Sequence, residues 1–373
     1  MILTSRSRYV GYANCARYGL LAYDFLGDGI GLESVSASLP LINGIVIHEV
    51  IAKILLGRDP EEALTEEITK YQEEVKKRGV RLEDPDTAFL LKEQETMLRG
   101  TVYAWLEIRY PLIIKEYEIV SVEKEMLWEM GDEVGDQIRL DLLARRRDDG
   151  GLFYVEWKTT TTGGEDWAKQ WEHNTQLLLN TLAVEEILGE RCEGVIIEGL
   201  VKGRRKIDDS MSSPFFGKRI QQSPLCYGWK NPTTNSFRSK YTSAAGWWKV
   251  ATWNEMDVRE WVKNVMDWEE KRKLFAPVPA IRPNRKQLTR ARKQVIAVER
   301  ERAEKLKFVR SGGDVDLAFP MNDDHCFRYW GHPCEFEKLC FSDEIASDPV
   351  GSGLFQPKES HHGRSSSTPT EAG

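Results

Sequence analysis

Three charged side chains interrupt apolar stretches in the middle of the sequence. Residues 152–159, LFYVEWKT, carry Glu156 and Lys158 among apolar and aromatic residues, and residues 136–146, DQIRLDLLARR, carry Asp141. The DDGG sequence between these two segments is typical of the turn of a β-hairpin. Because side chains alternate across a strand, a hairpin here can place all three charges on one face.

Two registers of this hairpin are compatible with the turn. A loop of Asp148 and Asp149 places Asp141 opposite Glu156, whereas a loop of Asp149 and Gly150 places it opposite Lys158. Cross-strand neighbours lie about 4.5–5.5 Å apart, so in either register two carboxylates can share a divalent cation. The alternative is a surface ion pair on a half-exposed hairpin.

The order of these residues resembles the D…ExK…Q pattern of the PD-(D/E)XK nuclease superfamily. Asp141 comes first, then Glu156-Trp157-Lys158, then Gln176 on the next expected helix. His48, in GIVIHE, extends the resemblance to the RecB-type branch, which includes CRISPR-associated iron-sulfur exonucleases. The resemblance covers roughly residues 10–200 and the cysteines near the C-terminus. It implies an α/β fold of the restriction-endonuclease-like kind, with a mixed sheet core flanked by helices.

The resemblance also implies a role for each residue of the pattern. It implies Mg²⁺ or Mn²⁺ ligands at four positions, namely His48, Asp141, Glu156 and the backbone carbonyl of Trp157. Lys158 would position the attacking water and stabilise charge on the phosphate, and Gln176 would orient the lysine or the substrate. Without the resemblance, a histidine beside an apolar helical stripe is typical of a structural residue. The family often has Tyr four residues after the Gln, where this chain has Asn180.

Three of the six cysteines cluster near the C-terminus, at Cys326, Cys334 and Cys340. The segment around Cys15, YANCARYGLLAYDF, resembles the first-cysteine region of RecB-type iron-sulfur nucleases. The resemblance implies that these four cysteines form a metal clamp around a [4Fe-4S] cluster, joining N- and C-terminal helical segments. Four thiolates suit Zn²⁺ equally well, and unrelated core cysteines are the third possibility. The spacing of Cys326 departs from the usual C-x-x-C, with seven residues before Cys334.

Hydrophobic periodicity indicates which elements position these residues. Residues 1–117 read mainly as helices and include Cys15 and His48, with an apolar stripe at Ile47, Val50, Ile51, Ile54 and Leu55. Residues 118–200 form the expected nuclease core, in which strands are predicted near 117–130, 136–146, 152–159 and 192–203. A helix ending at Gly189 is expected between the last two, and this order predicts a mixed sheet.

The remaining third of the chain divides into three parts. Residues 201–255 form a basic and aromatic insertion, residues 256–341 contain C-terminal helices and the cysteine cluster, and residues 342–373 are expected to be a disordered tail. Between Arg282 and Arg310, eleven Lys or Arg against three acids give a net charge of +8 on an expected long helix.

Basic and aromatic residues alternate in the insertion, a mixture that suits phosphate contacts and stacking on unpaired bases. The candidate nucleic-acid-binding residues are Lys202, Arg204, Arg205, Lys218, Arg219, Lys240 and Trp247. Ordinary loops with aromatic anchors are the alternative. The net charge of -7 argues against a surface coated all over with nucleic acid, but it is compatible with a local basic channel. No base-reading motif and no Walker-type motor sequence is present.

Together these features predict a divalent-metal-dependent DNA nuclease. The resemblance favours an exonuclease acting on DNA ends or single strands, in DNA recombination, repair or phage DNA processing, with a helicase or recombination protein as a partner. An endonuclease of the same fold and a non-catalytic DNA-end-binding scaffold are the alternatives. The absence of a secretory signal and of a long apolar span predicts a cytoplasmic protein, in a bacterium or a phage-infected cell, without membrane contact.

Overall fold

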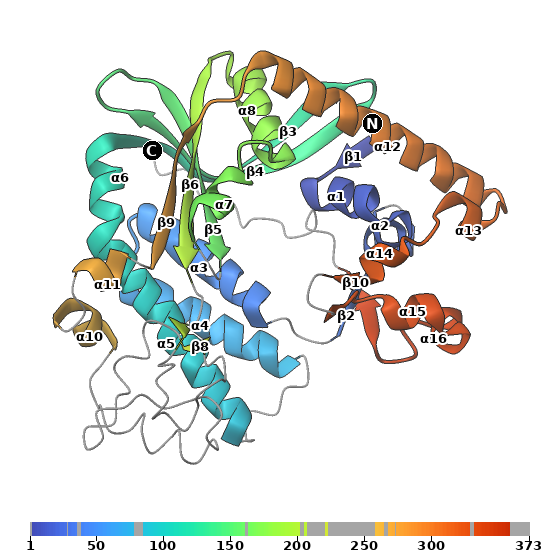
Figure 1. The fold of residues 1–373 in the computed structure, drawn as a ribbon, viewed down its shortest axis with the longest axis horizontal. Helices are drawn as coiled ribbons and strands as arrows, with labels where there is room; N and C mark the ends of the chain where they lie inside the picture. Colours follow the sequence, from blue (N-terminus) through green and yellow to red (C-terminus); the bar gives the residue numbers. More distant parts are fainter. Residues whose placement is uncertain are drawn as a thin grey trace, which may run out of the picture. The chain divides into compact units, whose positions relative to one another are not determined.

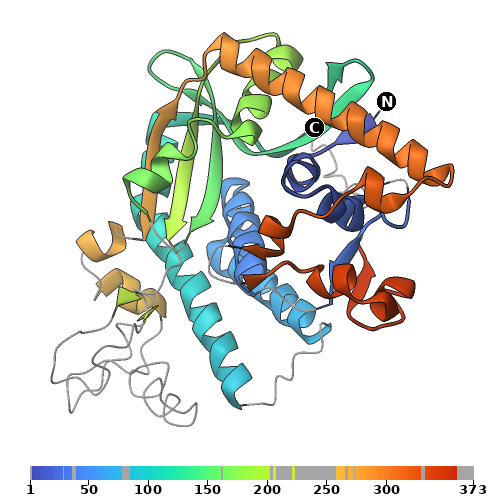
Figure 2. The same ribbon diagram turned by 45° about the vertical axis from the view of Figure 1, so that its right-hand side comes forward.

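Figure 1 labels the helices and strands of the computed structural model, and Figure 2 shows the same ribbon turned about the vertical axis. Contacts within the chain divide it into two compact units. Unit 1 comprises Met1–Ala37, Met126–Ile138 and Lys286–Gly373, and unit 2 comprises Ser38–Glu125 and Arg139–Arg285. The structure describes residues 2–27, 29–35, 39–77, 85–160, 163–201, 205–206, 221–222, 258–264, 268–272, 274–328 and 332–358.

Unit 2 contains most of the expected nuclease core 118–200 together with helices that come before and after it in the chain. Its helices are α3 (Leu39–Leu55), α4 (Pro60–Lys77), α5 (Pro85–Ile108), α6 (Tyr110–Glu116), α7 (Glu165–Lys169), α8 (Thr175–Leu188), α10 (Val258–Asn264) and α11 (Trp268–Arg272). Its strands are β5 (Leu152–Thr160), β6 (Cys192–Val201), β7 (Arg205–Lys206), β8 (Gln221–Gln222) and β9 (Phe275–Ile281), with parts of β3 (Tyr117–Gly131) and β4 (Val134–Arg146). The four predicted core strands are therefore present as β3, β4, β5 and β6.

The sheet of unit 2 is mixed. Its order runs β4-β5-β6-β9, and β3 pairs with β4. Strands β4 and β5 are antiparallel, β5 and β6 are parallel, and β6 and β9 are antiparallel. Because parallel neighbours need a crossover, α7 and α8 connect β5 to β6, which is the arrangement predicted from the order of the elements.

The predicted single helix before Gly189 is two helices. Residues 170–174 separate α7 from α8, and the Asn174 side chain caps α8 by accepting a hydrogen bond from the Gln176 backbone N–H at 3.0 Å. This N-cap starts a new helix and places Gln176 in its first turn. Gly189 ends α8 in the left-handed conformation (φ 65°), as expected for a helix C-terminus.

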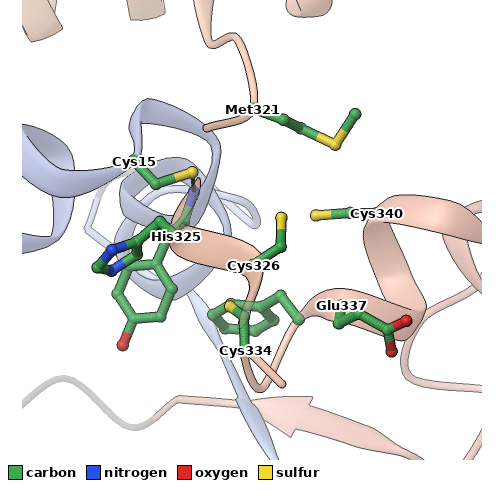
Figure 3. Close-up of a pocket in the computed structure, with 9 residues that line it drawn as sticks. Cys15, Met321, His325, Cys326, Cys334, Glu337 and Cys340 are labelled. Atoms are coloured by element: carbon green, nitrogen blue, oxygen red, sulfur yellow. Dashed lines mark hydrogen bonds between the residues drawn. The ribbon is translucent and has the colours of Figure 1, made fainter. Parts of the chain in front are cut away.

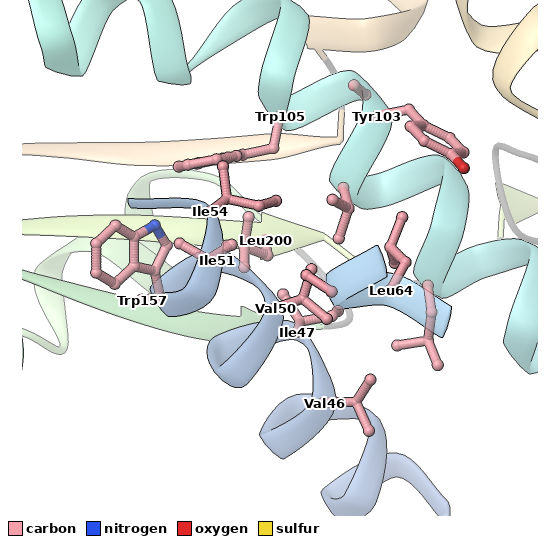
Figure 4. Close-up of a cluster of buried hydrophobic side chains, with 14 of the residues drawn as sticks. Val46, Ile47, Val50, Ile51, Ile54, Leu64, Tyr103, Trp105, Trp157 and Leu200 are labelled. Carbon is pink, nitrogen blue, oxygen red and sulfur yellow. The ribbon is translucent and has the colours of Figure 1, made fainter. Parts of the chain in front are cut away.

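The hydrophobic core of unit 2 lies between one face of the sheet and helices α3, α4 and α5 (Figure 4). The α3 residues Ile47, Val50, Ile51 and Ile54 pack there against Trp105 of α5 and against Val155 and Trp157 of β5. The predicted stripe is therefore buried, although Leu55 is only partly so. Since Val155 and Trp157 face this core, alternation directs Tyr154, Glu156 and Lys158 to the other face, where the Tyr154 hydroxyl donates to Leu177 O of α8 at 3.0 Å.

Unit 1 combines the N-terminal and C-terminal parts of the chain with residues 126–138, which include the turn between β3 and β4. Its N-terminal elements are β1 (Ile2–Thr4), α1 (Arg6–Asn14), α2 (Ala16–Tyr23) and β2 (Leu32–Ser34). Its C-terminal elements are α12 (Arg285–Arg310), α13 (Val315–Ala318), α14 (Asp323–Cys326), β10 (Phe327–Arg328), β11 (His332–Pro333), α15 (Glu337–Phe341), α16 (Asp343–Ser347) and β12 (Phe355–Pro357). Strand β1 pairs in parallel with residues 134–136 of β4.

A buried polar network holds α12 to the N-terminal elements of unit 1. Arg302 donates to Glu299 at 2.6 Å and lies 3.2 Å from Asp24, while Thr4 donates to Glu299 at 2.6 Å. Asp136 is also buried, and its Oδ1 has no hydrogen-bond partner among the described residues. Apolar contacts of Tyr12, Leu20, Leu306 and Phe319 surround the network.

The structure tests two predictions about the C-terminal part of the chain. The expected basic helix is α12, and it is a helix of 26 residues. The prediction of a disordered tail is wrong for residues 342–358. Helix α16 follows Ser342, and strand β12 pairs antiparallel with β2. The N-terminal strand β2 supplies the backbone hydrogen-bond donors and acceptors for β12, and the sequence of the tail by itself does not indicate this pairing. Residues 359–373 lie outside the described residues.

Among the described residues, no helix combines the length and the apolar character needed to cross a membrane.

Candidate active site and cysteine pocket

The hairpin that carries the charged residues adopts the first of the two predicted registers. Leu142 pairs with Val155 and Leu143 with Tyr154, so continuation of the register places Asp141 opposite Glu156. The loop has four residues instead of two, since Arg146 N donates to Gly151 O at 2.9 Å. Its centre is still between Asp148 and Asp149, which is why the register is unchanged.

Hydrogen bonds connect the residues of the expected pattern within unit 2. The Trp157 backbone N–H donates to Asp141 Oδ2 at 2.8 Å, and Lys158 Nζ forms a partly buried ion pair with Glu156 Oε1. Gln176 Nε2 of α8 donates to the same Glu156 oxygen at 2.9 Å, and its Oε1 lies 3.4 Å from Lys158 Nζ. The sheet and the first turn of α8 thus bring the carboxylates, the ammonium and the amide together.

His48 approaches this group from α3. Its Nδ1 lies 3.5 Å from Asp141 Oδ2, and its side chain is mostly buried. Burial lowers the pKa of His48, but the charge of Asp141 and their hydrogen bond outweigh it, so the pKa is raised above its usual range. His48 therefore lies beside Asp141, and its role as a metal ligand stays a prediction.

The two carboxylates differ electrostatically although both are buried. Burial raises the pKa of Glu156 and the negative charge of Asp141 raises it further, while Lys158 and His48 oppose this rise without cancelling it. Burial by itself would raise the pKa of Asp141. The charge and hydrogen bond of His48, together with the Trp157 N–H, outweigh this effect, so the pKa of Asp141 is below its usual value. Two buried acids with opposite shifts are typical of a functional centre, although structural ion pairs also produce such shifts.

The donor set of this centre fits a divalent cation. Glu156 Oε2 is buried and has no hydrogen-bond partner among the described residues, so one oxygen still lacks a donor or a cation. Carboxylate oxygens are the ligands that Mg²⁺ and Mn²⁺ prefer, and an imidazole is compatible with Mn²⁺. Across the described ranges, however, no three His, Cys, Asp or Glu side chains form a ready-made metal-binding group. Lys158 and the backbone of β5 occupy carboxylate oxygens instead.

One further acidic residue beside this centre was missed in the sequence. Glu123 of β3 has its Oε2 2.9 Å from Arg139 Nε, and Arg139 also lies 4.0 Å from Glu49. Burial, and after it the charge of Asp141, raises the pKa of Glu123 to about 8, although Arg139 opposes this. One signal in the sequence could have drawn attention to Glu123. The apolar residues of this strand are odd-numbered at Tyr117 and Ile119 but even-numbered at 126, 128 and 130.

The four expected clamp cysteines line one pocket in unit 1 (Figure 3). Cys15, Cys326, Cys334 and Cys340 surround it together with Tyr18, Met321, His325, Phe336 and Glu337. Cys15 lies between α1 and α2, and its Sγ accepts the Tyr18 N–H at 3.4 Å. Figure 3 shows the sulfur of Cys340 directed towards Cys326.

The unusual spacing of Cys326 has a structural explanation. Strands β10 and β11 form a short antiparallel hairpin, which returns the chain so that Cys334 N donates to Cys326 O at 2.6 Å. Burial raises the pKa of Cys326, and burial raises that of Cys340 to about 11 against the opposing charge of Arg17. Both shifts favour the protonated thiol, and among the described residues these cysteines do not form a ready-made metal-binding group.

Most of the predicted nucleic-acid-binding residues lie outside the described residues. These are Lys202, Arg204, Lys218, Arg219, Lys240 and Trp247. Arg205 belongs to β7, which pairs with β8.

A mixed sheet with a D…ExK hairpin and a following helical Gln defines a class of phosphodiester-cleaving, metal-dependent enzymes. A family model of the PD-(D/E)XK nuclease superfamily matches residues 4–340. The chain belongs to this superfamily. No curated protein matches the chain.

Proposed function

We propose that the protein is a divalent-metal-dependent DNA exonuclease that acts on DNA ends or single strands. Recombination, repair or phage DNA processing is the setting we infer for it. The observation that carries the proposal is the hydrogen-bonded group of Asp141, Glu156, Lys158 and Gln176 in unit 2. Membership of the superfamily supports the nuclease activity, and the exonuclease preference rests on the resemblance to the RecB-type branch.

In this proposal Asp141 and Glu156 hold Mg²⁺ or Mn²⁺, with His48 and the Trp157 carbonyl as further ligands. The ion, when bound, polarises the phosphodiester and lowers the pKa of its water. The Trp157 N–H holds Asp141 Oδ2 in place, so that the carboxylate keeps its orientation. Glu156 Oε2, which has no partner among the described residues, is the oxygen available to the ion.

Lys158 and Gln176 act on the substrate side of the centre. The Lys158 ammonium, which is partly exposed, can approach the phosphate and stabilise the negative charge that develops there. Gln176 bonds both Glu156 and Lys158, and α8 holds it rigidly because its N-terminus is capped by Asn174. Gln176 therefore limits the positions that Lys158 can take.

The cysteine pocket is proposed as a structural metal clamp of unit 1, holding a [4Fe-4S] cluster or Zn²⁺. Its support is that Cys15 and the three C-terminal cysteines line one pocket although 311 residues separate Cys15 from Cys326. Thiolates suit both groups, so softness of the ligands does not choose between them. Loading would release protons from the thiols and add to the stability of unit 1.

DNA is the proposed partner, through the basic and aromatic insertion 201–255. A helicase or a recombination protein is the protein partner that we infer from the RecB-type resemblance. An endonuclease of the same fold is the second candidate activity. A non-catalytic end-binding scaffold is the third, and the retained ion pair of Lys158 with Glu156 argues against it.

The proposal is tested by Mn²⁺-dependent release of nucleotides from labelled DNA. Linear and closed circular single strands are compared for the full-length protein and for Glu156→Ala and Lys158→Ala. Asp148→Asn, at an exposed position of the same hairpin, is the matched control. We expect cleavage of linear DNA only, lost in both site variants and retained in the control. Cleavage of circles would identify an endonuclease, and full activity of the folded site variants would show that the site is wrong.

A further inference from the structure

The burial pattern of strand β3 changes around Glu123. Before this residue, positions 118 and 120 are exposed and 117 and 119 are partly buried, whereas after it 125, 127 and 129 are exposed and 126, 128 and 130 are buried. The packing partners change as well, because Tyr117 and Ile119 pack against the core of α3 and α5, whereas Trp128 lies against Arg292 of α12. Glu123 lies where the strand passes from one packing environment to the other.

The backbone of Glu123 departs from regular strand geometry. Its φ is +48°, a conformation that a residue with a Cβ adopts rarely and at an energetic cost. Glycine would adopt the same φ without this cost, yet the chain has a glutamate there. The presence of a glutamate at a position that glycine would fill without strain therefore calls for an explanation.

The Glu123 side chain lies beside a residue on the face that carries the candidate active site. Glu123 Oε2 is 2.9 Å from Arg139 Nε, although the two groups do not meet hydrogen-bond geometry. Arg139 precedes Asp141 by two residues on β4, so both side chains point to one face of the strand. The negative charge of Asp141 also acts on Glu123. Glu123 therefore lies near Asp141, next to Arg139.

A second observation indicates that one oxygen of this acidic group is not satisfied by the described residues. Glu156 Oε2 is buried with no hydrogen-bond partner among the described residues, and the Glu156 side chain is 3% exposed. Lys158 and Arg139 are the cations that pair with the carboxylates of Glu156 and Glu123. A divalent cation with its bound water would satisfy the oxygens that remain.

We propose that Glu123 is a positioning residue of the metal site, whose carboxylate accepts hydrogen bonds from water on the cation held by Asp141 and Glu156. This inference rests on the proposed function. An outer position suits the distance, because Mg²⁺ keeps several of its waters and uses only a few carboxylates directly. Groups that orient metal ligands or bound water from outside contribute strongly to metal affinity.

Mn²⁺ binding to the full-length protein, measured by calorimetry or by the electron paramagnetic resonance of free Mn²⁺, tests the proposal. We expect Glu123→Gln and Glu123→Gly to bind Mn²⁺ about 10-fold more weakly than the wild type. Glu123→Gly removes the strained φ, so it should unfold within a few degrees of the wild type and exclude misfolding as the cause. Glu125→Gln is the control, since it removes the same charge two residues away at an exposed position.

The outcomes separate this inference from the function on which it rests. Asp141→Asn should abolish tight Mn²⁺ binding. If it does so while both Glu123 variants bind Mn²⁺ within about twofold of the wild type, the role of Glu123 is wrong and the metal site is right. If Glu125→Gln weakens binding as much as Glu123→Gln, only net charge matters and the inference is overturned. If Asp141→Asn binds as the wild type does, the metal site is wrong and the inference with it.

Discussion

The candidate active site and the cysteine pocket are both expected to hold a metal, but they are assembled differently. Asp141, Glu156 and Lys158 come from one hairpin and are already bonded to one another or to the backbone. The pocket cysteines come from opposite ends of the chain, and burial raises the pKa of Cys326 and Cys340, which favours their neutral thiols. Charged groups can thus organise a site before any ion arrives, whereas neutral thiols attract one another little.

This difference predicts different consequences of metal loss. In unit 2 the sheet, the core against α3 and the ion pair of Lys158 with Glu156 remain when no ion is bound. In unit 1 the cysteine elements are small, since α14, β10, β11 and α15 have between two and five residues each. Metal loss should therefore abolish activity in unit 2 and reduce stability in unit 1.

The largest expected effect separates the two sites by activity. Lys158→Ala should lower DNA hydrolysis about 10²–10³-fold, because it removes a positive charge aimed at the phosphate. Metal content of the cysteine pocket, measured by elemental analysis, should not change. Lys169→Ala removes an exposed lysine of α7 and serves as the control. A loss of pocket metal in Lys158→Ala would show that the two sites are not independent.

The second effect distinguishes the cysteine pocket from the candidate active site by the stability of the protein. Cys326→Ser should release the pocket metal and lower the free energy of unfolding by several kcal/mol, about the scale on which structural metals couple to folding. Calorimetry together with iron and zinc analysis of anaerobically purified protein measures both quantities. Brown protein with iron identifies the cluster, and colourless protein with stoichiometric zinc identifies Zn²⁺. Cys192→Ser, at a buried cysteine outside the pocket, should keep the metal. Unchanged metal in Cys326→Ser would contradict the clamp.

A third effect belongs to unit 1 and is independent of the cysteines. Burial, with help from Glu299, raises the pKa of Asp136 from 3.8 to about 7. The folded state therefore holds a proton between pH 4 and 7 that the unfolded state releases, so the stability contributed by Asp136 falls as pH rises to about 7.

Asp136→Asn should remove that fall. Between pH 5 and 8 the wild type should lose about 2 kcal/mol more unfolding free energy than the variant. Urea denaturation at the two pH values measures the difference, and Asp132→Asn, at an exposed residue, is the control. An equal loss in the wild type and Asp136→Asn would mean that the carboxyl is ionised throughout.

The smallest effect concerns the second layer of the active site. Gln176→Ala should lower DNA hydrolysis about 10-fold, since it removes one hydrogen bond to Glu156 and one to Lys158 but neither charge. Gln170→Ala, at an exposed position just after α7, should leave the rate unchanged. A loss as large as that of Lys158→Ala would assign Gln176 a direct role at the phosphate.

Local patterns predicted much of unit 2. The strands around Asp141 and Glu156 are present because alternation of apolar residues is a local property, and turn residues define the hairpin centre. The helix α12 follows from its periodicity in the same way. The break between α7 and α8 was missed, because an Asn174 cap and a solvated Asn look alike in sequence.

Contacts between distant segments could not be predicted. The pairing of β12 with β2 joins segments more than 300 residues apart, and the tail therefore appeared featureless. Glu123 looked like one of many exposed strand glutamates until its φ and its neighbour Arg139 were known. The buried position of Asp136 likewise depends on α12, which lies far away in the chain.

The sequence by itself determined which residues could do chemistry and which face of each strand or helix they occupy, because periodicity and turn chemistry act over a few residues. Only the tertiary structure decided the register, the burial of each charge and the partners that shift its pKa. Those properties depend on which distant segments exclude water, and free energies of burial and pairing are set by the surroundings of a residue and not by its type.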